Sequence, residues 1–238
     1  MTSFNKILAC IMLAMLFAVS CTKPDEPNNG GNSGNNDTLI FIPEYVDLGL
    51  PSGTLWATCN VGAEVPEGRG DYFAWGETQP KDTYNWGTYQ YCNGDYNLLT
   101  KYCFKSSYGL NGFADSLTVL EPADDVATTC WGADWRMPTK EEWDELYRKT
   151  TVTMTTQNGV EGRLLTGVNG NSIFLPATGF CLEEEIICLG LGVYWTSSVH
   201  TDYPERAWSF HYDLDECHVC GTYERNRGQV VRAVRVCQ

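Results

Sequence analysis

Apolar residues recur at short intervals along most of the chain, in the pattern of many brief strands. Short stretches rich in Val, Ile, Tyr, Phe and Trp are separated by Gly and Asn, which favour turns. Alternation along such a stretch places one set of side chains in a core and the other set toward solvent. We expect strands within residues 45–50, 54–63, 71–77, 162–168, 171–179, 192–198, 207–213 and 229–237.

The middle of the chain has two segments with signals for helices. The first, residues 121–132, has Pro122 in its first turn, followed by acidic residues that interact favourably with the positive end of the helix dipole. It is expected to end at Gly132, because glycine readily adopts the backbone angles that follow a helix. This segment predicts a short helix directly before a second one.

The second helical segment covers residues 139–149. Thr139 is a suitable N-cap, and Glu142 three residues later completes the pattern of a capping box. In the turns that follow, three large apolar side chains at i, i+3 and i+4 form one apolar stripe, which predicts a half-buried amphipathic helix. These side chains are Trp143, Leu146 and Tyr147.

Three stretches show neither the helical nor the strand periodicity and are predicted to be long loops, the first with at most one short strand: residues 78–118, 180–192 and 214–228. The order is therefore strands, two helices, then strands, which is typical of an α+β fold. No repeat with a period of 20–50 residues is visible, and no second linker divides the chain. We expect one domain, from Leu39 to Gln238.

The first 20 residues are predicted to be a signal peptide. Lys6 supplies a positive charge, and the apolar run 7–19 is shorter than the roughly 20 residues that a membrane-spanning helix needs. Residues 17–21 resemble the lipobox of bacterial lipoproteins, in which the cysteine, here Cys21, carries the lipid. The chain would then be held at a membrane through Cys21. Residues 21–38, rich in Asn and Gly, are expected to form a flexible tether.

Charge and a short motif indicate where the chain is located. Lys23, followed by Asp25 and Glu26 but interrupted by Pro24, resembles the export signal of Bacteroidetes-type lipoproteins that reach the outer face of the outer membrane. The net charge of −14 argues against nucleic acid as a partner, because its phosphates require a basic surface. We therefore expect a lipid-anchored protein of the outer membrane, exposed at the cell surface.

Cysteine usage is consistent with export. Of 11 cysteines, Cys10 falls in the signal peptide and Cys21 is the lipid site, so 11 − 2 = 9 remain in the domain. An exported protein lies in a compartment that permits disulfides. Because nine is odd, at least one thiol is left free or pairs between molecules. We expect disulfides within the domain, with Cys181–Cys188 as a local pair.

Six motifs follow one another between residues 45 and 235: "YVDLGLPSGTLWATCNVGA", "GDYFAWGET", "DDVATTCWGADWRMPTKEEWDEL", "NSIFLPATG", "GVYWTSS" and "VVRAVR". Their content and order resemble the Fibrobacter succinogenes major paralogous domain family. The resemblance implies a C-type-lectin-like fold, with a twisted antiparallel sheet, two flanking helices and a long loop region. Members of that family are mostly exported and uncharacterised, so the resemblance indicates the fold more than the function.

One of these motifs also resembles formylglycine-generating sulfatase-modifying enzymes, which share the wider fold. The matching positions are Arg136, Pro138, Thr139 and Trp143. Their expected role is structural in both cases: Arg136 pairs with carboxylates or carbonyls, and Pro138 sets the entry to the helix. Thr139 then caps the helix and Trp143 packs beneath it. We interpret this stretch as a signature of the fold, not of catalysis.

The chemistry of those enzymes is not carried over to this chain. They use two cysteines near the end of the domain to bind copper, whereas Cys217 and Cys220 here have a different spacing. By itself this pair is compatible with a disulfide, half of a zinc site or a redox pair; without a second CxxC, a disulfide or free thiols are favoured. The Trp-Asn-Asp motif of calcium-dependent lectins is missing. We expect no catalytic residue, metal site or cofactor.

A binding surface is predicted instead in residues 194–227, where Tyr, Trp and Arg, the usual hot-spot residue types, are abundant. In C-type-lectin-like folds this region carries the ligand. Alternation along the strands places Trp195 and Trp208 inside the domain, and at least one of Arg232 and Arg235 is expected to be a buried, paired arginine. The exposed candidates for ligand contact are Tyr203, His211, Tyr223, Arg225 and Arg227.

Taken together, these patterns predict a non-enzymatic binding module displayed at the cell surface. Its partner would be an extracellular glycan or protein, and its contact with the membrane would be the lipid on Cys21. Two alternatives stay open. One is an oxidoreductase related to formylglycine-generating enzymes, which would need a reactive pair in Cys217 and Cys220. The other is a structural component of the cell envelope, or an adhesin, that assembles with itself.

Overall fold

The computed structural model describes residues 41–213 and 217–235, apart from the side chains of residues 217–220. The predicted signal peptide, the lipid site Cys21 and the tether up to residue 38 lie outside the described residues. In the part that is described, no helix is long and apolar enough to cross a membrane. The buried residues of the hydrophobic clusters all lie between Leu48 and Val234, so the compact unit from Leu39 to Gln238 contains the complete described core.

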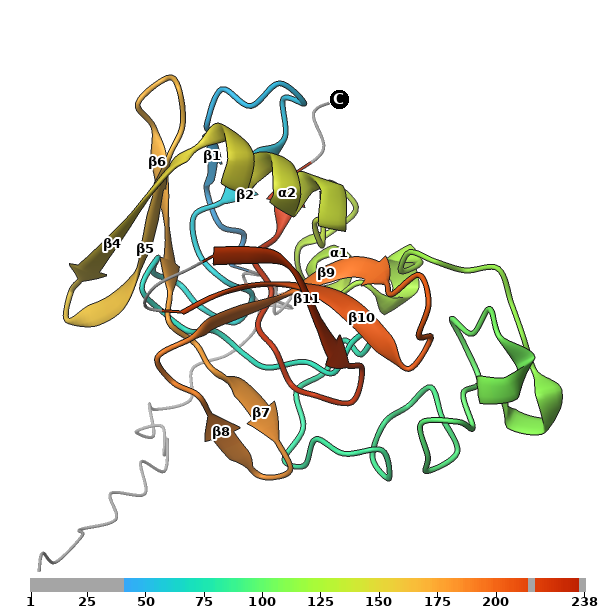
Figure 1. Ribbon diagram of the computed structural model, residues 1–238. Helices are drawn as coiled ribbons and strands as arrows, with labels where there is room; N and C mark the ends of the chain where they lie inside the picture. The colour runs from blue at the N-terminus through green and yellow to red at the C-terminus, as the bar shows by residue number, and fades with distance from the viewer. Residues whose placement is uncertain (1–40, 214–216, 236–238) are drawn as a thin grey trace, which may run out of the picture. The chain divides into compact units, whose positions relative to one another are not determined.

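The described chain is a strand-rich α+β structure with few helices (Figure 1). Short segments rich in β-branched and aromatic residues form its strands, because such side chains pack well on a pleated surface. The elements are β1 (Tyr45–Asp47), β2 (Leu55–Ala57), α1 (Val126–Trp131), β3 (Trp135–Arg136), α2 (Lys140–Lys149), β4 (Thr151–Gln157), β5 (Val160–Thr166), β6 (Ser172–Pro176), β7 (Phe180–Leu182), β8 (Glu185–Ile187), β9 (Gly192–Val199), β10 (Arg206–Tyr212), β11 (Cys217–Glu224) and β12 (Val234–Arg235).

The strands form four small antiparallel sheets, with the orders β1-β2-β12-β3, β11-β10-β9, β4-β5-β6 and β7-β8. The first two are connected by a parallel bridge between Tyr194 of β9 and Val230, which precedes β12. In Figure 1, α2 lies above β9, β10 and β11, and the β7–β8 hairpin lies below them. The three strands β9–β11 are therefore central, and they carry the region in which ligand contact was predicted.

The helix predicted from residue 139 is confirmed as α2. The Thr139 hydroxyl accepts the N–H of Glu142 at 3.2 Å, and the Glu142 carboxylate accepts the N–H of Thr139 at 2.8 Å. Both guanidinium Nη atoms of Arg136 donate to this carboxylate at 2.6 Å. Trp143 is fully buried and stacks on Phe210 of β10 with ring centroids 4.5 Å apart. These contacts hold the start of α2 against the central sheet.

The first predicted helix is shorter than expected. Residues 122–124 form a separate 3-10 turn (η3), and α1 follows with Asp125 as its N-cap. The Asp125 carboxylate accepts two backbone N–H groups of the first turn and also the N–H of Met137 at 2.7 Å. The helix ends at Gly132 as predicted, with a positive φ of 92° that glycine adopts readily. Asp125, and not Pro122, therefore fixes where α1 begins.

Several strand and loop predictions were wrong. The segment that forms β4 was not predicted, because its threonines obscure the apolar alternation. The hairpin β7–β8 lies inside the predicted loop 180–192, and β11 lies inside the predicted loop 214–228. Residues 71–77 form no strand. Their β-pairing in the described chain is the isolated bridge between Phe73 and Gln229, and single hydrogen bonds, such as that from the Trp75 N–H to the Arg225 carbonyl at 2.9 Å, join them to other segments. The elements that the pattern misses are thus strands that belong to hairpins.

The long irregular stretch 78–118 is confirmed. Its regular structure consists of two 3-10 turns, η1 (Ser106–Tyr108) and η2 (Leu110–Gly112), with single bridges between them and the preceding loop. Tyrosines from this stretch are nevertheless buried: Tyr89 and Tyr102 are at most 3% exposed. The stretch is therefore a packed loop whose position is determined by side-chain contacts with the rest of the domain.

The prediction of a buried, paired arginine near the C-terminus is confirmed for Arg232. Its side chain is fully buried, and its Nε donates to the Asn60 side-chain oxygen at 2.8 Å. One Nη donates to the carbonyls of Ala57 and Thr58, each at 3.2 Å. Arg235 differs, because it is only half-buried and its ion pair with Asp134, at 3.2 Å, is partly exposed.

The expected disulfide between Cys181 and Cys188 is wrong. Both are free thiols: Cys181 lies opposite Ile186 in the hairpin and is buried, whereas Cys188 follows β8 and is exposed. The other cysteines of the described side chains are also free thiols, and burial raises the pKa of each of them, which keeps them protonated and unreactive near neutral pH. They are Cys59, Cys92, Cys103 and Cys130. The side chains of Cys217, Cys220 and Cys237 lie outside the described residues.

Candidate functional site

The five residues predicted for ligand contact occupy different environments. Tyr203 lies in the turn between β9 and β10 and is 50% exposed, as expected for a contact residue. His211, Tyr223 and Arg227 are half-buried, and Arg225 is fully buried. The predicted face is therefore not one surface, and only Tyr203 lies on an open part of the domain.

The turn that carries Tyr203 is built by backbone contacts. The N–H of His200 donates to the carbonyl of Arg206 at 3.0 Å, and the N–H of Arg206 donates to the carbonyl of Tyr203 at 2.9 Å. The His200 ring closes the turn from the side, because its Nδ1 accepts the N–H groups of Asp202 and Tyr203 at 3.0 and 3.2 Å. The Tyr203 ring is thereby held at the end of the central sheet.

Around this turn three rings and two ammonium groups form what we call the aromatic surface: Lys105, Lys140, His200, Tyr203 and Trp208. The His200 ring stacks on Trp208 with centroids 4.5 Å apart and lies 5.3 Å from the Tyr203 ring. The Nζ of Lys140 lies 4.8 Å from the Trp208 ring centroid, within the range of a cation–π contact. Trp208, predicted to be inside, is in fact half-buried and open to this surface.

Lys105 connects the long loop to the same surface. Its ammonium group lies 5.8 Å from the Tyr203 ring centroid and donates to the backbone carbonyl of Asp202. Lys105 is exposed, and Lys140 is the first residue of α2, so the two cations come from elements far apart in the chain. Sequence reasoning missed both, because neither lysine has a local motif that connects it to residues 200–208.

His200 is neutral at physiological pH in this arrangement. Burial of the ring is the main cause that lowers its pKa, and the positive charges of Arg206 and Lys105 act in the same direction against the opposing effect of Asp202. The hydrogen bonds agree, because an Nδ1 that accepts two backbone N–H groups leaves the proton on Nε2. The positive charge of the aromatic surface therefore comes from Lys105 and Lys140.

The prediction that Arg225 is exposed is wrong, because its side chain is completely buried. Its Nε donates to the Tyr89 hydroxyl at 2.9 Å, and its two Nη atoms donate to the carbonyls of Tyr102, Pro204 and Lys101 at 3.2, 2.9 and 3.1 Å. The guanidinium also lies 4.9 Å from the Trp75 ring centroid. Arg225 thus joins the long loop to the Tyr203 turn, and it helps to hold that turn in place.

A buried polar cluster next to Arg225 was also not predicted. The Asp124 carboxylate accepts the Tyr91 hydroxyl at 2.7 Å, the Tyr102 hydroxyl at 2.5 Å and the ammonium group of Lys101 at 2.6 Å. Burial opposes the charge of Asp124, but hydrogen bonds from Lys101, Tyr102 and Tyr91 outweigh it and lower the pKa of this carboxyl. The cluster connects the long loop to η3 and has the satisfied hydrogen bonding of a structural network.

His211 and Tyr223 belong to the opposite side of the central sheet. Tyr223 lies across from Ala207 in the β10–β11 register, so its side chain shares the face of Ala207 and not that of Trp208. Its ring contacts Phe180 at 5.1 Å and His211 at 6.2 Å between centroids. Burial raises the pKa of the Tyr223 phenol. These two residues line the contact between the central sheet and the β7–β8 hairpin.

Arg227 is engaged in a local ion pair. Its Nε and one Nη both donate to the same carboxylate oxygen of Glu224, at 2.9 and 2.6 Å. The pair is partly exposed, with the side chains 22% and 33% accessible. Arg227 therefore retains some access to solvent, but Glu224 largely balances its charge. Glu224, its ion-pair partner, is not a residue of the aromatic surface.

A groove of about 810 Å³ lies elsewhere, lined by Tyr45, Trp131 and Trp135 together with Asp134 and Arg235. Two charged residues of this groove, Asp134 and Arg235, form an ion pair with each other. The Arg235 guanidinium carbon also lies 4.9 Å from the centroid of the Tyr45 ring. Over the ranges 41–213 and 217–235, no three His, Cys, Asp or Glu side chains come together as a metal site. The aromatic surface, with an exposed tyrosine ring and two ammonium groups close to its rings, is the candidate binding site that we develop below.

Comparison with known proteins gives no further guide to the site. No family model, no curated protein and no solved structure matches the chain.

Proposed function

We propose that this chain is a non-enzymatic binding module of C-type-lectin-like fold, and that its ligand contacts the aromatic surface. The observation that carries the proposal is the open group of rings at the end of the central sheet: Trp208 under His200, with Tyr203 half-exposed beside them and two lysine ammonium groups close to the rings. Trp and Tyr are typical of binding hot spots, and ammonium groups beside them attract a negatively charged ligand.

The charge of this surface contrasts with that of the whole chain. The net charge is −14, whereas the ionised groups among the five residues of the aromatic surface are two lysines. Flat rings favour a ligand with a planar or apolar face, and the ammonium groups favour one that carries a negative charge. An extracellular glycan with acidic sugars has both properties, and an acidic segment of a protein shares the second.

Two features of the sequence support the location and the fold in this proposal. The lipobox ending at Cys21 and the Asn/Gly-rich stretch after it would display the domain at the outer surface of the outer membrane. The order of the six motifs resembles that of the Fibrobacter succinogenes major paralogous domain family, and the strand-rich α+β arrangement is compatible with a C-type-lectin-like domain. Since a fold does not imply a function, the aromatic surface itself must be tested.

The test is a binding screen of the domain from Leu39 to Gln238 on arrays of glycans and of extracellular host proteins, with and without calcium. The key variant is Tyr203→Ala, which removes the most exposed ring of the surface. Tyr96→Ala is the matched control, because Tyr96 is also a loop tyrosine, 46% exposed, and its ring lies 6.3 Å from that of Tyr108, which is outside the aromatic surface. We expect loss of at least about tenfold in affinity for Tyr203→Ala and no change for Tyr96→Ala.

Three outcomes decide the matter. Loss of binding in Tyr203→Ala alone, with unchanged thermal stability, supports the aromatic surface as the binding site. Equal binding by Tyr203→Ala and the unchanged domain would move the site elsewhere. Binding of protein and not of any glycan would keep the site but exclude the lectin interpretation of it.

A further inference from the structure

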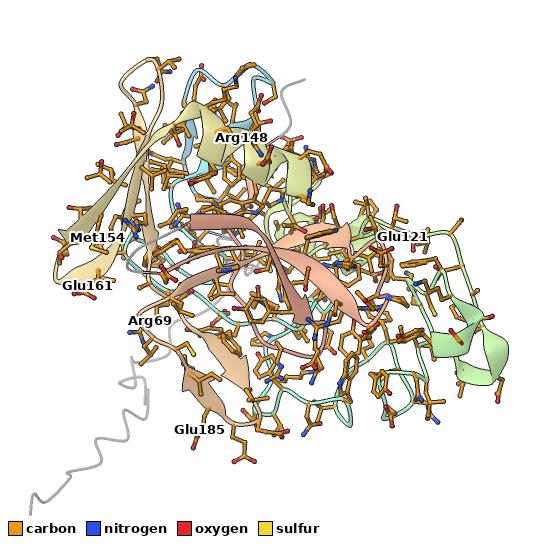
Figure 2. All side chains as sticks on the ribbon, viewed as in Figure 1. Arg69, Glu121, Arg148, Met154, Glu161 and Glu185 are labelled. Carbon is orange, nitrogen blue, oxygen red and sulfur yellow. The ribbon has the colours of Figure 1, made fainter. Side chains whose placement is uncertain are left out.

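The third sheet ends in an unusual edge strand. β4 pairs with β5 in continuous antiparallel register from Thr151↔Thr166 to Gln157↔Val160, without a bulge. The two are joined by the two-residue turn Asn158–Gly159, whose positive φ values of 48° and 83° are those of a tight hairpin. In Figure 2, Met154 of β4 lies at the outer margin of the molecule, near Glu161 of β5.

The register shows which backbone groups of β4 point away from β5. In a hairpin with a two-residue turn, the residues that flank the turn bond to each other, and bonded pairs then alternate along the strands. Thr151, Thr153, Thr155 and Gln157 therefore direct their N–H and C=O groups to β5. Those of Val152, Met154 and Thr156 point outward, and within the described ranges none of them has a backbone or side-chain partner.

β4 also lacks the residue types that usually protect a sheet edge. Its sequence, TVTMTTQ, contains no charge, no proline and no glycine, and Met154 is 47% exposed. The opposite edge of the same sheet is different: β6 ends in Pro176, which has no N–H, and the Pro176 carbonyl accepts the Tyr194 hydroxyl at 2.6 Å. One edge of the sheet is therefore blocked and the other is open to pairing.

The geometry points to a second copy of this chain as the partner of β4, in an antiparallel strand pair centred on Met154. With Met154 opposite its counterpart, Val152 faces Thr156 of the other copy, so all the outward N–H and C=O groups of these three residues are paired. The intervening position places Thr153 beside Thr155 of the other copy, and β-branched pairs of this kind stabilise sheets. The result is a continuous six-stranded sheet across a two-fold axis.

A second copy is favoured over another protein because the strand is self-complementary: each residue meets a neutral, β-branched or flexible partner in the two-fold register. The net charge of −14 on each copy opposes this association, but β4 itself is a stretch of seven residues that carries no charge, so the repulsion does not act at the contact strand. The contact is only one strand wide, so we expect weak association, on the order of micromolar dissociation constants or weaker.

The experiment is sedimentation equilibrium of the domain from Leu39 to Gln238, with reductant present because its described cysteines are free thiols. Met154→Lys places two like charges opposite each other at the proposed axis. Val168→Lys is the matched control: it makes the same change of charge at an 81% exposed apolar residue of the β5–β6 turn in the same sheet. The unchanged domain and Val168→Lys should approach the mass of two copies as concentration rises, and Met154→Lys should keep the mass of one.

Residue-resolved amide exchange locates the contact without relying on a variant. At low concentration the outward amides of Val152, Met154 and Thr156 should exchange fast, and at high concentration they should become protected. A domain that keeps the mass of one copy up to its solubility limit would overturn the proposal. So would association that Met154→Lys does not weaken, or a dimer in which these three amides still exchange fast.

Discussion

Replacing Arg225 by methionine tests the most consequential correction to the predicted site. The substitution keeps an unbranched apolar stem and removes the guanidinium, whose donors satisfy the carbonyls of Lys101, Tyr102 and Pro204 and the Tyr89 hydroxyl. Each buried acceptor that loses its donor costs about 1–3 kcal/mol. The variant also avoids the burial of a charge in the native fold, which offsets part of that loss. We expect a net decrease of about 2–4 kcal/mol in the free energy of unfolding.

The assay is equilibrium unfolding in urea, followed by tryptophan fluorescence, for Arg225→Met and for Arg227→Met. Arg227 is two residues away, and its ion pair with Glu224 is partly exposed, so its replacement should change stability by less than about 1 kcal/mol. Limited proteolysis should detect earlier cleavage within residues 89–104 in Arg225→Met, because this variant releases the long loop.

Two results would refute the structural interpretation of Arg225. One is a loss of less than about 1 kcal/mol in Arg225→Met, since that would mean that the buried acceptors find other donors. The other is a variant of full stability that loses ligand, which would make Arg225 a contact residue in spite of its burial. A combined loss of stability and binding supports the interpretation, because the Tyr203 turn depends on the same guanidinium.

Two further predictions concern stability. Thr139→Ala removes the N-cap of α2 and should lower the free energy of unfolding, measured by urea titration, by about 1 kcal/mol. An unchanged free energy would show that the Arg136–Glu142 pair alone fixes the start of the helix. Burial raises the pKa of the Tyr72 phenol from 10.0 to about 12. The stabilisation by the neutral phenol is therefore complete below pH 10 and is lost as the pH rises toward 12. Tyr72→Phe should flatten this fall in thermal midpoint between pH 10 and 12, and an unchanged slope would contradict the assignment.

The parts of the fold that could be predicted are those determined by neighbouring residues. The start of α2 is such a case, because Thr139 and Glu142 are three residues apart and their capping box forms within one turn. The end of α1 at Gly132 is another, since the positive φ there is a property of the glycine itself. By contrast, β4 and β11 are strands because of the hairpins that they complete, and their own polar residues give no clear alternation.

The candidate site could be predicted only in part, for the same reason. Tyr203 lies in a turn between two recognisable strands, so its exposure follows from local sequence. The burial of Arg225 depends on acceptors more than 120 residues away, at Lys101 and Tyr102. Lys105 reaches the aromatic surface across a comparable separation. An arginine or lysine in a strand or loop does not reveal from sequence alone whether such distant partners exist.

The way in which the Tyr203 turn is held has a consequence for recognition. Its fixed contacts use main-chain atoms: Arg225 donates to the carbonyl of Pro204, Lys105 donates to the carbonyl of Asp202, and the N–H groups of Asp202 and Tyr203 donate to His200. The shape of the turn therefore depends on residues around it and little on its own exposed side chains.

Substitutions at Thr201, Asp202 and Tyr203, all exposed, should consequently alter ligand choice with little loss of stability. Substitutions at His200 or Arg225, whose side chains bond to the backbone of the turn, should instead disturb the position of the turn. A rigid support beneath exchangeable exposed side chains is the arrangement that a recognition surface needs, because affinity rises when the contact residues are already held in place before the ligand binds. The proposed function and the buried position of Arg225 are in this sense two aspects of one structure.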